Sequence, residues 1–190
     1  MRSRVSPEFF DRLYAGEADP WGFASSPYER AKYDATLAAL PDRRFGSALE
    51  IGCSIGVLTE RLAARCERLL AVDVAEAALA RASERLAGCA NVTLERRELP
   101  EDFPAGSFEL IVCSEVLYYL DPPAFEALLA AAERELAPGG SLLAVHWRRE
   151  TETYPLGGDE VHERLAARFG APAVSARTDD YALDRFERRA

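Results

Sequence analysis

Short apolar runs alternate with amphipathic stretches along most of the chain. The runs have the composition of buried parallel strands. They span residues 47–52, 69–74, 108–116 and 141–147. A further strand is expected at 91–99, where Val92 and Leu94 alternate with polar residues. Between them, apolar residues recur at helical spacing, as at Leu79, Ala82 and Leu86. Strand and helix alternate repeatedly, which predicts an α/β fold with a parallel sheet and helices on both of its faces.

Two helices are expected before the first strand. Ser6 suits a helix N-cap and Pro7 suits the first helical position. The run Ser26-Pro27-Tyr28-Glu29 has the form of a capping box and opens a second helix. These helices either pack on an edge of the sheet or form a lid over a ligand. Trp21, in a loop rich in proline and glycine, favours the lid.

The pattern changes after Arg148. A helix is expected near Asp159, followed by two short antiparallel strands within residues 173–188. The chain of 190 residues has the length of one domain. We therefore expect a single domain over residues 1–190. It would consist of a helical cap at 1–41, a core at 46–147, and a substrate-side helix with closing strands at 148–190.

Composition excludes several classes of function. The net charge is -9 and no basic stripe appears, so a nucleic-acid interface is not expected. No apolar run approaches the ~20 residues that cross a membrane, and the N-terminus has no signal-peptide core. We expect a cytoplasmic protein with a small-molecule partner. The oligomeric state cannot be read from the sequence.

Of the four cysteines, Cys53 and Cys113 lie in apolar strand-like runs and are expected to be small buried hydrophobic residues. No two of them stand at CxxC spacing, and the two histidines lie far from all of them. A zinc site and a disulfide framework are therefore not expected. No other cluster of carboxylates and histidines has ligand spacing, so we predict no metal.

The glycine turn after the first strand is the strongest candidate for a nucleoside site. Gly52 and Gly56 bracket Ser54, and Asp73 follows 21 residues after Gly52. A bare backbone and a carboxylate at this distance suit a nucleoside cofactor. The pattern is GxxxG rather than GxGxxG, so a pyrophosphate could approach the backbone less closely. Glu50 would also repel phosphate, but it suits an ammonium group.

Ligands in open parallel sheets lie outside the carboxyl ends of the strands, so residues at those ends are expected to line one crevice. Beyond the first turn, these residues are Asp73, Glu98, Leu99, Ser114, Glu115, His146 and Trp147. Asp73 could instead cap the next helix. Glu115 at the end of an apolar strand is costly unless it is paired or faces a cleft. His146 and His162 have even odds of touching substrate or of being structural.

Four segments carry a family resemblance. They are EIGCSIG at 50–56, AVDV at 71–74, FELIVCSEVLYYL at 108–120 and LAPGGSLLA at 136–144. Together they resemble the class I S-adenosylmethionine-dependent methyltransferase superfamily. The N-terminal DPWGF and SPYERAKY, with EVLYYL, resemble its NodS-like branch, which N-methylates an amino sugar. The C-terminal HWRR and YPLGGDEVH segments are similar to methyltransferase modules fused to sugar N-deacetylases.

The resemblance implies a Rossmann-like, doubly wound, mostly parallel seven-stranded sheet with an antiparallel last strand and an N-terminal helical cap. It implies S-adenosyl-L-methionine as cofactor and S-adenosyl-L-homocysteine as product. The residues that it assigns to the cofactor are Glu50, Gly52, Cys53 and Ser54 for the methionine portion, Asp73 for the ribose, Val74, Glu98 and Leu99 for the adenine, Ser114 near the sulfonium, and Trp21, Tyr28 and Arg30 in the cap.

The expected activity is methyl transfer to a small-molecule acceptor, with an amine nitrogen favoured. A base is then needed only to keep the amine neutral, and His146, Glu115 or His162 are candidates. An O-methyltransferase, a nucleotide-binding oxidoreductase and a non-catalytic binding module are the alternatives. The oxidoreductase is disfavoured because the chain has one lysine, Lys32, and no Tyr-x-x-x-Lys pair.

Overall fold

The computed structural model describes residues 3–149, 151 and 153–189. They form two compact units. The N-terminal unit is Ser6–Glu98, and the C-terminal unit contains the residues from Leu99 onward together with those up to Val5.

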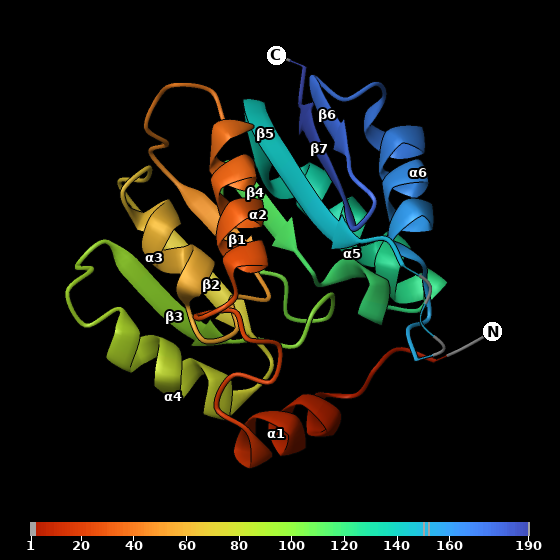
Figure 1. The fold of residues 1–190 in the computed structure, drawn as a ribbon. Coiled ribbons are helices and arrows are strands. Elements are labelled where there is room, and N and C mark those ends of the chain that lie inside the picture. The colour runs from red at the N-terminus through yellow and green to blue at the C-terminus, as the bar shows by residue number, and fades with distance from the viewer. Residues whose placement is uncertain (1–2, 150, 152, 190) are drawn as a thin grey trace. The chain divides into compact units, whose positions relative to one another are not determined.

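The N-terminal unit is built on three parallel strands in the order β3-β2-β1. Its elements are α1 (Pro7–Gly16), α2 (Pro27–Ala38), β1 (Ala48–Ile51), α3 (Val57–Ala63), β2 (Leu69–Asp73), α4 (Glu76–Arg85) and β3 (Val92–Arg96) (Figure 1). Leu69 pairs with Ala48 on one side and with Val92 on the other. Each strand therefore ends close to its neighbour's end, and the turn after β1 lies next to Asp73.

The C-terminal unit contains four strands in the order β4-β5-β7-β6. Its elements are β4 (Phe108–Ser114), the 3₁₀ turn η1 (Leu117–Tyr119), α5 (Pro122–Glu135), β5 (Leu136–Trp147), α6 (Gly158–Phe169), β6 (Val174–Arg177) and β7 (Tyr181–Glu187). β4 and β5 are parallel, whereas β7 is antiparallel to both β5 and β6. The two expected antiparallel strands near the C-terminus are thus confirmed.

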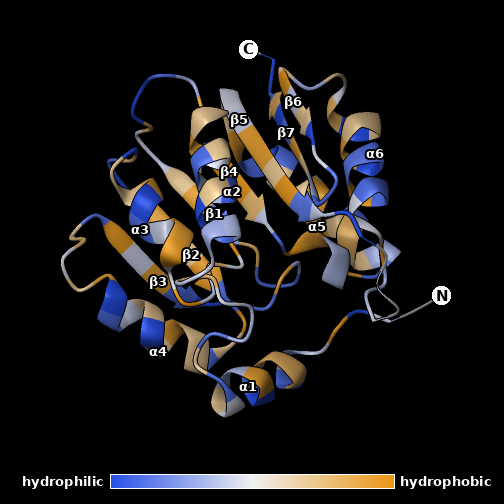
Figure 2. Cartoon of the chain, in the orientation of Figure 1, coloured by the Kyte–Doolittle hydropathy of each residue, from blue (hydrophilic) through white to orange (hydrophobic). Residues whose placement is uncertain are grey.

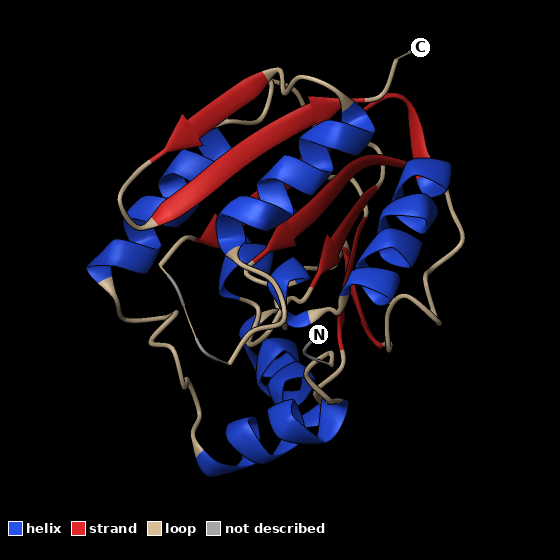
Figure 3. Cartoon of the chain, turned by 90° about the vertical axis from the view of Figure 1, so that its right-hand side faces the viewer, coloured by secondary structure: helices blue, strands red, loops and turns tan. Residues whose placement is uncertain are grey.

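The expected fold class is confirmed, since the seven strands are mostly parallel, the last are antiparallel and helices flank them. Within each unit, helices in blue lie against strands in red (Figure 3). β2 and β4 are mainly apolar, whereas β6 and β7 include several polar residues (Figure 2). Cys53, Cys66 and Cys113 are buried, as expected of small hydrophobic residues. In the described part of the chain, no helix is both long and apolar enough to cross a membrane.

Two strand boundaries differ from the expected ones by three residues or more. β5 begins at Leu136 rather than at residue 141, because the chain leaves α5 directly in extended conformation and Pro138-Gly139-Gly140 lies within the strand. The pairing with β4 shifts register there, from Phe108 with Leu136 to Leu110 with Ser141. β3 ends at Arg96, before the expected 99.

The start of α2 has half of the expected capping box. The Ser26 side chain accepts a hydrogen bond from the Glu29 backbone N–H at 3.3 Å. The backbone N–H of Ser26, however, donates to Gly22 O at 2.9 Å. The Glu29 carboxylate lies 2.9 Å from Lys32 Nζ, and both side chains are buried. The Glu29 carboxylate, which would complete a capping box, is thus paired with Lys32 instead.

Candidate functional site

The turn between β1 and α3 contains three residues in the left-handed region. The φ angles are 76° at Gly52, 52° at Ser54 and 78° at Gly56. Glycine adopts this conformation without penalty, whereas a serine is strained. A Cβ on Gly56 would also lie 3.1 Å from Leu86 and 3.2 Å from Ala82. Both glycines are therefore needed for the tight passage from strand to helix.

Asp73, at the end of β2, holds this turn in place. Its Oδ2 accepts a hydrogen bond from the Ser54 N–H at 2.8 Å, and its Oδ1 accepts one from the Ala75 N–H at 2.9 Å. Burial raises the pKa of Asp73, and these two hydrogen bonds oppose the rise. The carboxylate thus joins the glycine turn to Ala75, the residue that precedes α4. Each oxygen keeps a further lone pair that could accept a hydrogen bond from a ligand.

Glu50 is a buried acid on β1, two residues before Gly52. Its side chain is 2% exposed, and its Oε2 has no hydrogen-bond partner in the part of the chain that the structure describes. Burial raises the pKa of Glu50 to about 8, and the nearby charge of Asp73 acts in the same direction. A buried carboxyl oxygen without a partner is costly, so Oε2 is suited to a cationic group of a ligand.

Tyr14 is a site residue that the sequence did not indicate. Its hydroxyl lies 2.5 Å from Ser54 Oγ, although the two residues are 40 positions apart. The ring packs edge-on against Trp21 at 5.6 Å between centroids, and Trp21 stacks with Phe23. In the sequence Tyr14 was only one member of an apolar helix face. The hydroxyl on that face was the one signal of a polar contact.

Arg81 of α4 fixes the end of α1 that carries Tyr14. Its Nη1 donates to the carbonyl oxygens of Tyr14 at 2.8 Å, Glu17 at 3.1 Å and Ala18 at 3.2 Å. The loop that follows is closed by Asp19, whose carboxylate accepts the N–H groups of Phe23 and Ala24. The tyrosine and the tryptophan loop are therefore anchored to the same unit as the glycine turn.

The other residues predicted to bind the cofactor lie at several places. Cys53 is buried in the turn, and its N–H donates to Val72 O at 3.0 Å. Val74 is half-buried directly after Asp73, whereas Glu98 is exposed beyond the end of β3. Tyr28 and Arg30 are half-buried and exposed on α2, and Leu99 and Ser114 belong to the C-terminal unit. Their cofactor roles stay predictions.

In the C-terminal unit, Glu115 lies at the end of β4 with a left-handed φ of 55°. Its Oε2 accepts hydrogen bonds from the Tyr118 hydroxyl at 2.6 Å and from the Trp147 N–H at 2.9 Å. The Glu115 N–H donates to Val145 O at 2.8 Å. The carboxylate is half-buried and thus joins the ends of β4 and β5 to the η1 turn.

Three tyrosines pack together beside this carboxylate. Tyr118 stacks on Tyr154 with centroids 4.7 Å apart, and Tyr119 meets both rings edge-on. Burial raises the pKa of Tyr118, and the Glu115 charge adds to the effect. Its hydroxyl therefore keeps its proton and acts as a donor to Glu115.

His146 and His162 are buried in contact with each other. Their side chains belong to residues that are 0% and 2% exposed, and His146 Nδ1 lies 3.2 Å from His162 Nε2. His146 Nε2 accepts the Leu117 N–H at 3.2 Å, and His162 Nδ1 lies 2.6 Å from Asp184 Oδ2. All four ring nitrogens thus have partners within the protein. Their catalytic roles stay predictions, and these contacts favour positioning over proton transfer with a substrate.

The sequence model of the family "Nodulation protein S (NodS)" matches residues 11–189. The chain belongs to this family. A nodulation protein S from Bradyrhizobium diazoefficiens is 34% identical over 175 residues, covering 90% of the chain and 78% of the relative. One from Rhizobium tropici is 37% identical over 146 residues, covering 75% of the chain but only 60% of the relative's length.

A solved structure supports the same family. The N-methyltransferase NodS from Bradyrhizobium japonicum WM9, in complex with S-adenosyl-L-homocysteine, has a TM-score of 0.86 and 29% identity, covering 96% of the chain and 98% of that structure. The expected family is therefore confirmed. That structure is of an N-methyltransferase and holds S-adenosyl-L-homocysteine, the product of the cofactor that we expected.

Proposed function

We propose that this NodS-family chain transfers a methyl group from S-adenosyl-L-methionine to an amine nitrogen of a small-molecule acceptor, an amino sugar or a related metabolite. The observation that carries the proposal is the glycine turn with a buried, unpartnered Glu50 carboxyl oxygen on one side and Asp73 on the other. A dinucleotide would place phosphate charge against these two acids, whereas a cofactor with an ammonium group suits them.

The residues of the turn fit the polar groups of this cofactor. Glu50 would bind the α-amino group, which supplies the missing partner of its Oε2. The remaining lone pairs of Asp73 would accept the ribose hydroxyls, and the backbone of Gly52, Cys53 and Ser54 would receive the methionine portion. When bound, the cofactor supplies an electrophilic methyl group on a sulfonium. The protein's main task is then to align the nucleophile with that group.

The chain must also remove a proton from the acceptor amine. An amine nucleophile must be held in its neutral form, and Glu115 is the candidate that can take its proton at a carboxylate oxygen. The carboxylate is half-buried and fixed by Tyr118 and Trp147, so its orientation is set before an acceptor binds. A negative charge here also favours acceptors that carry an amino group.

Binding and turnover can be tested separately. Calorimetry should show S-adenosyl-L-homocysteine binding to the unaltered chain and at least about tenfold weaker binding to Asp73→Ala. Equal binding by both proteins would refute the site. NADH titrated by fluorescence serves as the competing ligand, and it should not bind.

Turnover is measured with isotopically labelled methyl donor over a panel of amino sugars, simple amines and hydroxyl analogues. N-methyl products identified by mass spectrometry and NMR would support the proposal. Methylation of hydroxyl analogues alone would favour the O-methyltransferase alternative. Tight binding of S-adenosyl-L-homocysteine without turnover of any acceptor would favour a binding module.

A further inference from the structure

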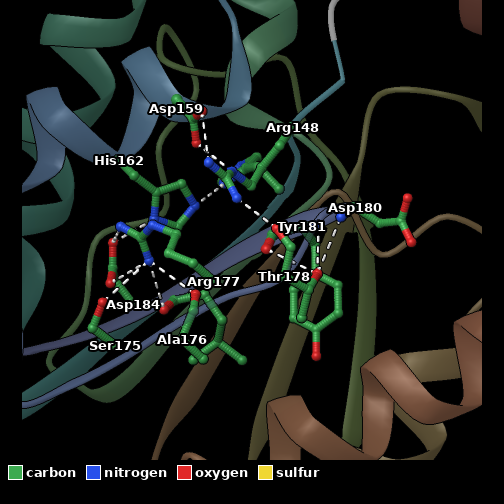
Figure 4. A network of polar contacts seen from close by, with 12 residues as sticks. Arg148, Asp159, His162, Ser175, Ala176, Arg177, Thr178, Asp180, Tyr181 and Asp184 are labelled. Atoms are coloured by element: carbon green, nitrogen blue, oxygen red, sulfur yellow. Dashed lines mark hydrogen bonds and ion pairs between the residues drawn. The ribbon is translucent and has the colours of Figure 1, made fainter.

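A line of four buried hydrogen-bonding groups runs through the C-terminal unit. It consists of the Asp184 carboxylate, the His162 ring, the His146 ring and the backbone N–H of Leu117, which we call the histidine relay. Figure 4 shows the outer half, where His162 lies beside Asp184 and Arg177. The relay crosses from β7 through α6 and β5 to the η1 turn. It connects residues that are far apart in the sequence. The proposed role of Glu115, which is to take the acceptor's proton, does not require these buried contacts.

The two ends of the relay determine where its protons lie. A backbone N–H can only donate, so His146 Nε2 must carry a lone pair toward Leu117. At the other end, Arg177 binds both oxygens of Asp184, at 2.9 and 2.6 Å. This pairing keeps the carboxylate ionised, so His162 Nδ1 must be the donor to it at 2.6 Å.

Only one neutral arrangement satisfies both ends. Each imidazole carries its single proton on Nδ1, so His146 Nδ1 donates to His162 Nε2. Every donor in the relay then points from Leu117 toward Asp184. An added proton would have to enter on an Nε2 atom, and both of these atoms already face an N–H donor. Such a proton therefore breaks one hydrogen bond of the relay.

We propose that the histidine relay is a positioning device: Asp184, through His162, holds His146 in the Nδ1–H tautomer, and His146 thereby fixes the Leu117 backbone and the turn that carries Glu115 and Tyr118. His146 and His162 are then positioning residues. The consequence for catalysis rests on the proposed function, because it assumes that Glu115 serves the acceptor. The tautomer and the anchoring of Leu117 do not depend on that function.

Charged groups surround the relay. Asp184 Oδ2 lies 2.6 Å from His162 Nδ1, and the Arg177 guanidinium pairs with the same carboxylate. Asp159 also acts on His162 from within α6, and Arg148 pairs with that aspartate at 2.6 Å. On the other side, the Tyr118 ring lies edge-on to His146, and its hydroxyl is bonded to Glu115. Acid that adds a proton to the relay should weaken its hold on Leu117, because that proton breaks one of these hydrogen bonds.

The test uses two Asp184 variants of the full chain. Asp184→Ala removes the acceptor at the end of the relay, so the His162 Nδ1 proton loses its partner. A second arrangement then competes, in which His162 Nε2–H donates to His146 Nδ1 and the His146 proton moves to its own Nε2. Asp184→Asn keeps an oxygen that can accept from His162, so it should restore the original arrangement. Arg168→Ala, on α6 in an exposed pair with Glu133, is the matched control.

Long-range ¹H–¹⁵N spectra of the imidazoles report the tautomers, and amide hydrogen exchange reports Leu117. In the unaltered chain at neutral pH, we expect both rings to be protonated at Nδ1 only. In Asp184→Ala, His146 should become protonated at Nε2 and the Leu117 amide should exchange about tenfold faster or more. Asp184→Asn and Arg168→Ala should keep both properties of the unaltered chain.

Several outcomes would overturn the proposal. They are an Nε2–H tautomer of His146 in the unaltered chain, unchanged imidazole spectra in Asp184→Ala, and unchanged Leu117 exchange in that variant. If Asp184→Ala does not fold, acid titration of the unaltered chain gives the same test, because the His146 tautomer and Leu117 exchange must change in one transition. These measurements need no acceptor, so a failed methyl-transfer assay would not be mistaken for a failed relay.

Discussion

The hydroxyl of Tyr14 lies 2.5 Å from the side-chain oxygen of Ser54, so helix α1 is hydrogen-bonded directly to the residue at the centre of the glycine turn. We expect Tyr14→Phe to weaken S-adenosyl-L-homocysteine binding by about three- to tenfold, because the loss of one hydrogen bond is worth about 1 kcal/mol. Calorimetry measures the affinity. Tyr33→Phe, on the buried face of α2, is the control, and an equal loss of affinity in both variants would contradict the prediction.

Ser54 has two opposing effects on the turn. Its left-handed φ of 52° costs about 1 kcal/mol relative to glycine, while its hydroxyl contacts Tyr14. We expect Ser54→Ala to lower the free energy of unfolding, since it loses the contact and keeps the strain. Ser54→Gly should be more stable than Ser54→Ala by about 1 kcal/mol in urea titrations. Equal stability of the two variants would mean that the turn is not strained.

Glu50 should make both stability and ligand binding depend on pH. Its pKa in the folded protein is about 8, above the ordinary value, so the folded state holds a proton that the unfolded state releases. This acid's contribution to stability is therefore present below the unfolded pKa and is lost as pH rises toward 8. At pH 8, Glu50→Gln should be more stable than the unaltered chain by about 1–3 kcal/mol in urea titrations.

The same acid should release a proton when a cationic ligand group binds to it. S-adenosyl-L-homocysteine affinity should rise from pH 6 to pH 8, and its binding heat should vary with the ionisation enthalpy of the buffer. Glu50→Gln should lose both effects and bind more weakly, although it is more stable. A binding heat that does not vary between buffers would mean that Glu50 releases no proton on binding. Glu50 would then not be the residue that binds the ligand's amino group.

Gly158 begins α6 against the end of β5. A Cβ at this position would overlap the carbonyl oxygen of Trp147, whereas one at Gly157 would meet nothing within 4 Å. We expect Gly158→Ala to lower the free energy of unfolding by about 2 kcal/mol or more, because backbone must move. Gly157→Ala should change it by less than about 0.5 kcal/mol. Chemical denaturation of the pair checks this difference, and equal effects would contradict the close approach.

The fold and the glycine turn could be predicted because their determinants are local. The apolar runs set the strands, and the spacing from Gly52 to Asp73 follows from one strand, one helix and the next strand. The hydrogen bond from the Ser54 N–H to Asp73 is the contact that this spacing allows. The start of β5 was misjudged, because Pro138-Gly139-Gly140 has the composition of a helix stop and here lies in a strand with shifted register.

The contacts of Tyr14 and of the histidine relay could not be predicted, since their partners are distant in the sequence. Asp184 has the sequence context of an acid on a short exposed strand, but it is 1% exposed and binds His162. The sequence does not indicate that Arg177 pairs with Asp184, because this contact depends on the pairing of β6 with β7. Polar partners of this kind are set by tertiary pairing rather than by spacing.

The buried pair of Glu29 and Lys32 has a practical consequence for labelling. Lys32 is the single lysine of the chain, and it is 2% exposed. Reagents directed at amino groups would therefore leave this side chain intact while α2 is folded. The rate of Lys32 acylation would then report the rate at which α2 opens locally. Ligands that close the N-terminal helices over the glycine turn would lower this rate.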